Sequence, residues 1–144
     1  METIILYGSA TGNAEEMSRY LTRIIECEKK TINDYSNKLE DLNNFEKVIF
    51  ICSTTGNGDF PENALIFWKK IKKRDLKKDL LKDLKFSVCA LGDTNYSYFC
   101  ESGKKLSKRL KELGAEEIKP IFYIDAVDDE EEQFNNYINI ITED

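Results

Sequence analysis

Two short segments of this chain are almost entirely apolar: VIFIC at residues 48–52 and FSVCAL at residues 86–91. A strand with one face in water alternates apolar and polar residues, whereas a parallel strand covered on both faces forms a nearly continuous apolar run. No apolar run approaches the length of a membrane-spanning helix, so membrane insertion is not expected. The two segments predict central strands of a parallel sheet that has helices on both faces.

The rest of the chain supplies the other strands and the helices of such a sheet. Further strands are expected at residues 3–7, 30–34 and 118–124, the last weakened at its start by Pro120. Helical spacing predicts four helices. The first covers residues 13–27, with Met17, Leu21, Ile24 and Ile25 on one face, and the second begins at Pro61, with Leu65, Trp68 and Ile71 on one face. The third carries Leu106, Leu110 and Leu113 and ends at Gly114, and the last carries Phe134, Ile138 and Ile141. The Lys-rich residues 75–84 predict a solvated connecting turn or short helix. Five strands alternating with helices predict a doubly wound α/β sheet in one domain, residues 1–144.

Composition excludes several classes of function. The chain has 144 residues, a net charge of -6 and no histidine. Without histidine there is no Ser-His-Asp or Cys-His catalysis and no His-ligated metal, and the acidic balance argues against nucleic acid as a partner. The four cysteines show no CxxC spacing, so we expect reduced thiols, no metal site and a cytoplasmic protein.

Ligands of doubly wound sheets bind where the strands end, at the carboxyl edge. The first strand is followed by GSATGNA, residues 8–14, in which two glycines bracket small polar residues. Such a loop at a helix N-terminus can hold a phosphate with backbone N–H groups and no cation. The alternative is a plain strand-to-helix turn, with Asn13 as the N-cap and Glu16 completing a capping box.

Two more loops reach the same edge. STTGNGD, residues 53–59, contains a Gly-Asn-Gly turn whose peptide planes can reorient at low steric cost. LGDTNYSYFC, residues 91–100, places three aromatic residues within a span of four. One of them is suited to cover a flat ligand, while core packing is the alternative for each. Together the loops suit a flat ring with a phosphorylated tail.

These motifs resemble those of the flavodoxin family and of the FMN-binding domain of diflavin reductases, such as the sulfite reductase flavoprotein and methionine synthase reductase. The resemblance covers nearly the whole chain: LYGSATGNAEEMS is similar to the phosphate loop, CSTTGNGDFPENALIFW to the inner flavin loop, and LGDTNYSYFCESGKKLSKRLKELGA to the outer flavin loop. GDFPEN leans toward the diflavin branch. The resemblance implies a flavodoxin-like three-layer sandwich with a five-stranded parallel sheet of order 2-1-3-4-5.

The resemblance also implies FMN as the cofactor and assigns its contacts by motif position. The phosphate is expected to contact Ser9, Ala10, Thr11, Gly12, Asn13 and Ala14, and the inner side of the ring is expected to contact Ser53, Thr54, Thr55, Gly56, Asn57 and Gly58. Tyr96 is expected to stack on the outer face, and Leu91, Gly92, Asp93, Phe99 and Cys100 to surround the ring. The sugar-alcohol chain is expected to lie near Asp125 or another acid up to Asp129. Many relatives carry Trp or Tyr where this chain has Thr55. One stacking partner is therefore expected to be missing.

The implied function is transfer of single electrons between a flavin reductase and a cytochrome or metalloenzyme, by a monomer with no catalytic residue of its own. The Gly56-Asn57 peptide is where the family's redox-linked flip is expected. Acids after the strands, including Asp59, Asp93 and residues 128–132, predict a docking rim, although the last run also suits a helix start. Alternatives are the FMN domain of a larger NADPH-dependent reductase, a flavin-free interaction module, and a receiver domain. A receiver needs an acidic pair after the first strand, where this chain has Gly8 and Ser9.

Overall fold

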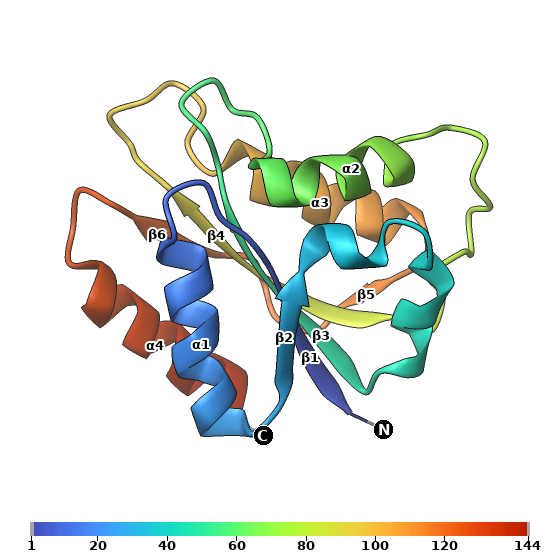
Figure 1. Ribbon diagram of the computed structural model, residues 1–144, viewed down its shortest axis with the longest axis horizontal. Coiled ribbons are helices and arrows are strands. Elements are labelled where there is room, and N and C mark those ends of the chain that lie inside the picture. Colours follow the sequence, from blue (N-terminus) through green and yellow to red (C-terminus); the bar gives the residue numbers. More distant parts are fainter. Residues whose placement is uncertain (1, 144) are drawn as a thin grey trace.

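One parallel sheet forms the centre of the protein, with two helices on each face (Figure 1). The structure is a computed structural model that describes residues 2–143. Helices α1 (Asn13–Ile25) and α4 (Glu130–Thr142) cover one face, and α2 (Glu62–Ile71) and α3 (Glu101–Glu112) cover the other. This arrangement confirms the expected three-layer α/β sandwich.

The main path of the sheet is β2-β1-β3-β4-β5, and every strand pair is parallel. The strands are β1 (Thr3–Gly8), β2 (Glu28–Thr31), β3 (Lys47–Ser53), β4 (Lys85–Gly92), β5 (Glu116–Glu117) and β6 (Phe122–Asp125). The expected order 2-1-3-4-5 is confirmed, but the expected fifth strand is two strands, since β6 also pairs with β4. Pro120 lies between them and has no N–H to donate to a ladder, which explains the interruption.

The central strands are buried on both faces, as their apolar runs predict. In β1, Ile4 and Leu6 belong to the core under α2 and α3, whereas Ile5 and Tyr7 belong to the core under α1 and α4. Strand β3 divides in the same way, with Phe50 in the first core and its neighbours in the second. Because successive side chains of a strand point to opposite faces, only an apolar run can fill both cores.

The structure corrects several expectations about the local elements. Strand β2 begins before the expected 30–34 range, and two 3₁₀ segments that were not expected, η1 (Ile32–Tyr35) and η2 (Leu39–Asn44), lie between β2 and β3. Ile24 was expected on the buried face of α1 but is 43% exposed. Pro61 precedes α2 as its N-cap instead of occupying its first turn.

Residues 75–84 form turns that are not wholly solvated. Leu81 and Leu84 are fully buried, and the Leu81 N–H donates to the Leu113 carbonyl at 2.9 Å. Lys77, Lys78 and Lys82 are exposed, so this segment closes one end of the core while its charges face outward. The expectation of a solvated connection rested on its lysines and did not anticipate that Leu81 and Leu84 are buried.

Candidate functional site

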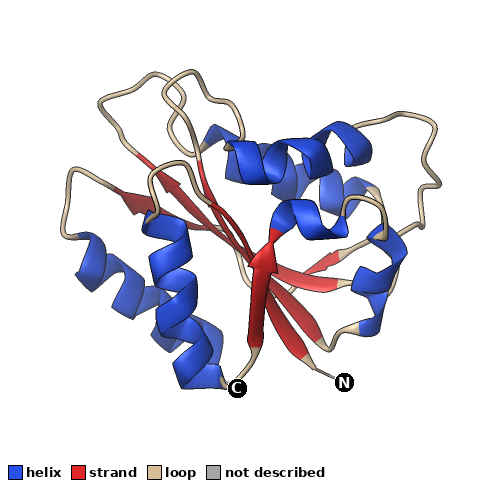
Figure 2. Cartoon of the chain, viewed as in Figure 1, coloured by secondary structure: helices blue, strands red, loops and turns tan. Residues whose placement is uncertain are grey.

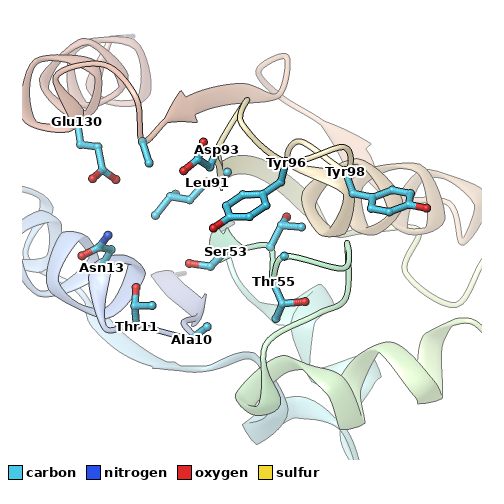
Figure 3. Close-up of a pocket in the computed structure, with 14 residues that line it drawn as sticks. Ala10, Thr11, Asn13, Ser53, Thr55, Leu91, Asp93, Tyr96, Tyr98 and Glu130 are labelled. Atoms are coloured by element: carbon cyan, nitrogen blue, oxygen red, sulfur yellow. The ribbon is translucent and has the colours of Figure 1, made fainter.

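The loops after β1, β3, β4 and β6 gather at the carboxyl edge of the sheet (Figure 2). They line a hollow that is open to solvent on one side (Figure 3). It is lined by Ala10, Thr11, Asn13, Ser53, Thr54, Thr55, Gly56, Leu91, Gly92, Asp93, Tyr96, Tyr98, Ala126 and Glu130.

One end of the hollow is the loop before α1. Gly12 is the N-cap residue, has φ 97° and makes no side-chain cap, and its N–H donates to the Ser9 hydroxyl at 2.8 Å. The expected N-cap at Asn13 is therefore wrong, because Asn13 is already the first helical residue. Glu16 forms no capping box and instead pairs with Arg19 at 3.1 Å. The first-turn N–H groups of α1 are left available to an anion.

The inner loop is a tight turn. The Gly58 N–H donates to the Thr55 carbonyl at 2.9 Å, which places Gly56 and Asn57 at the two central positions. The Thr55 hydroxyl accepts from the Asp59 N–H at 3.1 Å. Gly58 has φ 83°, and a Cβ there would lie 2.8 Å from the Cβ of Tyr98. Glycine at position 58 is thus required by both backbone conformation and close packing.

A buried set of hydroxyl groups holds the floor of the hollow. The Ser102 N–H donates to the Thr54 Oγ1 at 3.2 Å, and the Ser102 hydroxyl donates to the Ser53 carbonyl at 2.7 Å. The Thr54 hydroxyl lies 2.7 Å from the Ser102 Oγ. Since Ser102 uses its proton on Ser53, Thr54 must donate in this pair. The hydroxyl proton of Thr54 therefore points into the protein.

The outer loop contributes Tyr96 and Tyr98, which are 58% and 54% exposed. A Cβ on Gly56 would be 4.0 Å from the Tyr96 Cε1, so the Tyr96 ring lies beside the inner loop. Tyr96 thus lines the hollow with one side and faces solvent with the other.

Two predicted contacts of the outer loop do not line the hollow. Cys100 is fully buried, and its thiol donates to the Ala90 carbonyl at 3.3 Å. Burial raises the pKa of Cys100 to about 12, so the thiol stays neutral. Phe99 packs on Tyr123, with ring centroids 6.0 Å apart. These two side chains support the loop from behind.

The segments that follow β4 and β6 carry acidic side chains at or near the hollow. Asp93 and Glu130 line the hollow (Figure 3), but Asp125 does not. The Asp125 carboxylate accepts from the Thr94 N–H at 3.1 Å and the Val127 N–H at 3.2 Å. Desolvation acts to raise the pKa of Asp125, but the hydrogen bonds from Thr94 and Val127 outweigh it and hold the pKa below its ordinary value. Asp125 therefore ties the outer loop to β6.

The structure brings together most of the predicted site residues. Those away from the lining are Ser9, Gly12, Ala14, Asn57, Gly58, Phe99, Cys100 and Asp125. Three lining residues escaped the sequence analysis: Tyr98, Ala126 and Glu130. The aromatic cluster at residues 96–99 was a sequence signal for Tyr98, and the acidic run at residues 128–132 was a weaker signal for Glu130. Ala126 carries no chemical signal.

The residues present fit a flat ring with a phosphorylated tail. Uncapped backbone amides and the neutral side chains of Thr11 and Asn13 form one end, and the inner loop together with the Tyr96 ring forms the other. None of the lining residues, all within 2–143, is Lys or Arg. The fold and this hollow define a class: a doubly wound α/β protein that holds a phosphorylated ring cofactor at the carboxyl edge of its sheet.

The comparisons narrow this class to a family. The family model described as Flavodoxin matches residues 5–138, and the chain belongs to the flavodoxin family. FMN, the cofactor expected from the sequence, is the cofactor of this family. A solved flavodoxin from Pseudomonas aeruginosa, a cysteine-to-serine mutant, superposes with a TM-score of 0.78 at 26% identity, covering 98% of this chain and 96% of that one. Oxidised Flavodoxin 2 from Bacillus cereus gives 0.75 at 25% identity, covering 96% and 95%.

Curated relatives are longer proteins. NADPH-dependent diflavin oxidoreductase 1 of Xenopus laevis is 40% identical over 78% of this chain and 19% of its own length. The sulfite reductase [NADPH] flavoprotein alpha-component of Bacillus subtilis is 38% identical over 83% of this chain and 20% of its own. The chain thus spans about a fifth of the length of these relatives.

Two further features of the described residues bear on other functions. Between residues 2 and 143 no helix combines the length and apolar character needed to cross a bilayer. Across the same range, His, Cys, Asp and Glu side chains do not gather in threes or more as metal ligands would.

Proposed function

We propose that the chain carries single electrons from a flavin reductase to a cytochrome or metalloenzyme, with its FMN edge exposed at the open side of the hollow. The single observation that carries this proposal is the opening itself. The hollow is walled by Tyr96, Asp93 and Glu130 and opens to solvent at the edge where no helix covers the sheet. A cofactor held there is within reach of a docked protein.

FMN supplies the redox chemistry, and the protein supplies binding and electrostatics. The amides at the start of α1 hold the phosphate, and the Ser53–Gly56 backbone and Tyr96 flank the ring. Cys52, directly before this loop, is fully buried, and burial raises its pKa to about 12, so no thiolate lies beside the ring. Asp93 and Glu130 oppose added negative charge; one unit charge about 8 Å away contributes roughly 2 kcal/mol at an effective dielectric of about 20.

A rim of acids around the opening favours a basic partner. Asp59, Glu62, Asp128, Asp129, Glu131 and Glu132 are all exposed. They follow β3 and β6, so they stand at the carboxyl edge beside the hollow. Such charges govern the rate of association more than the final affinity, and salt screens them.

A second candidate is the FMN domain of a larger NADPH-dependent diflavin reductase. The observation that favours it is the identity of 38–40% to proteins of that kind, set against 25–26% to the solved flavodoxins. The two candidates differ in their electron donor. NADPH reduces the flavin of a diflavin reductase directly, whereas a separate carrier needs an added reductase. Whether NADPH alone reduces the flavin of the protein isolated from its natural source distinguishes the two candidates.

The test of electron transfer uses the FMN-loaded protein, chemically reduced and mixed with cytochrome c in a stopped-flow instrument. Transfer is expected to slow steeply as ionic strength rises. Replacing residues 128–132 with Asn and Gln is expected to flatten that dependence. The proposal fails if the protein takes up no FMN, or if transfer from the unmodified protein is insensitive to salt.

A further inference from the structure

The start of α2 contacts the phosphate loop through one side chain. The Asn63 Oδ1 accepts a hydrogen bond from the Ser9 N–H at 2.8 Å, across 54 positions of sequence. Asn63 lies in the first turn of α2, directly after the inner flavin loop and Pro61. A side chain that follows the inner flavin loop thereby bonds to the backbone of the phosphate loop.

This contact continues into the loop. Ser9, whose N–H is held by Asn63, accepts from the Gly12 N–H through its own hydroxyl at 2.8 Å. Two N–H groups of the loop are therefore used inside the protein. Those of Asn13, Ala14 and Glu15 meet no acceptor among the described residues, because α1 has no side-chain cap. The bonds from Ser9 to Asn63 and from Gly12 to Ser9 thus determine which N–H groups of the loop bond within the protein and which remain available to an anion.

Asn63 is itself held in place from two directions. A Cβ on Gly8 would lie 2.9 Å from the Cβ of Ala64, so α2 rests directly on the end of β1. On the other side, Asn33 of η1 donates to the Glu62 carbonyl at 2.9 Å and accepts from the Phe67 N–H at 3.0 Å. The Asn63 side chain that accepts from the Ser9 N–H thus projects from a helix start that other contacts hold in place.

We propose that Asn63 is a positioning residue for phosphate recognition: by fixing the Ser9 N–H, it shapes the loop whose remaining amides bind the phosphate of FMN. An amide is suited to this role because it accepts a hydrogen bond without carrying a negative charge beside the phosphate. The inference rests on FMN binding by this chain. It adds that the start of α2 controls affinity for the phosphate group and not for the ring.

The experiment compares FMN with riboflavin, which has the same ring and sugar-alcohol chain but no phosphate. Apoprotein is titrated with each ligand, and binding is followed by flavin fluorescence. The Asn63→Ala variant is expected to bind FMN about tenfold more weakly, the loss of one well-held hydrogen bond and of the loop shape that depends on it. Its affinity for riboflavin is expected to stay unchanged. Equal weakening of both ligands, or no weakening of FMN, would overturn the proposal.

Asn43→Ala is the matched control. Asn43 also accepts a backbone N–H, that of Asp83 at 3.1 Å, and donates to the Leu80 carbonyl at 3.0 Å, away from the hollow. This variant is expected to lose stability without changing either affinity. If it changes the ratio of FMN to riboflavin affinity as Asn63→Ala does, that ratio reports general loosening and the proposal fails.

A second variant keeps the proposal testable if Asn63→Ala does not fold. Asn63→Asp retains an oxygen acceptor for the Ser9 N–H but adds a negative charge. It is expected to bind riboflavin normally and FMN weakly, with part of the loss recovered at high ionic strength. Unchanged FMN affinity would refute a position near the phosphate. Failure of the unmodified protein to bind FMN would instead remove the function on which the inference rests.

Discussion

The phosphate end of the hollow is one continuous stretch, residues 8–14, whereas the ring end is assembled from segments far apart in the sequence. The first is held by short contacts, Gly12 to Ser9 and Ser9 to Asn63, each 2.8 Å long. The second brings together the loops after β3, β4 and β6. The two ends meet in one hollow but depend on different interactions.

The ring end also combines a buried, hydrogen-bonded floor with an exposed wall. Its floor is fixed by the buried Ser102, bonded to Ser53 and Thr54, while Tyr96 is 58% exposed. The phosphate end has no equivalent of this exposed aromatic side chain among its residues 8–14. The phosphate loop is therefore held by hydrogen bonds, whereas one wall of the ring end is a side chain exposed to solvent. Comparing FMN with riboflavin separates the two ends.

The strongest effect is expected at the exposed wall, Tyr96. Tyr96→Ala removes the outer aromatic surface, which contributes about 0.5–1.5 kcal/mol beyond the apolar area it covers. Both FMN and riboflavin are expected to bind more than about tenfold more weakly. Titration of apoprotein by flavin fluorescence measures this. Tyr20→Ala, at a similarly exposed tyrosine on α1, is the control. Unchanged affinity in the Tyr96 variant would show that this wall does not contact the ring.

A smaller and more selective effect is expected at the phosphate end. Gly12 has φ 97° and nothing within 4 Å of an added Cβ, so Gly12→Ala acts through backbone strain alone. Such strain is about 1–2 kcal/mol, and FMN is expected to bind roughly tenfold more weakly while riboflavin is unaffected. Gly114→Ala is strained in the same way at φ 95° but lies at the end of α3. It should lower the unfolding free energy without changing the affinity ratio; a shared change would remove the distinction between the two ends.

At the rigid floor, Ser102→Ala removes the hydroxyl that donates to the Ser53 carbonyl and that accepts the proton of the Thr54 hydroxyl. Thr54 keeps only the bond from the Ser102 N–H. An unsatisfied buried polar group costs about 1–3 kcal/mol, so stability to urea is expected to fall by that order. Both flavins are expected to bind a few-fold more weakly, with a shift in midpoint potential. Ser107→Ala, which removes a bond from the same helix to Glu117, should affect stability only. A Ser102 variant with normal flavin affinity would mean that the floor is not rigidly coupled to the ring.

The weakest effect is expected at Thr55. A tryptophan there would restore an inner stack of about 0.5–1.5 kcal/mol. It would also remove the hydroxyl that accepts from the Asp59 N–H, a loss of about 0.5–1.5 kcal/mol. The two terms nearly cancel, so Thr55→Trp should change FMN affinity by less than about threefold. Thr55→Val, which loses the hydroxyl without gaining a ring, should bind more weakly than either. Tight binding by the Trp variant would show that the turn does not need this hydrogen bond.

Much of the fold follows from local patterns. The apolar runs at 48–52 and 86–91 required burial on both faces, and strands β3 and β4 extend them by only a residue or so at each end. Gly114 was expected to end a helix and has the positive φ that this position requires. The loop at residues 8–14 was recognised because its glycines and small polar residues are adjacent in the chain. In each case the physical cause lies within a few residues of its effect.

Other features required the tertiary structure, because they depend on residues that meet only after folding. Glu130 lines the hollow, whereas Asp125 is held away from it by Thr94, and no local pattern distinguishes these two carboxylates. Cys100 lies in the loop that faces the site, yet its thiol turns into the core toward Ala90. Local patterns were enough to predict the parallel sheet and the loop that suits a phosphate. Folding decided which side chains face the hollow, since that depends on packing and hydrogen bonds between distant segments.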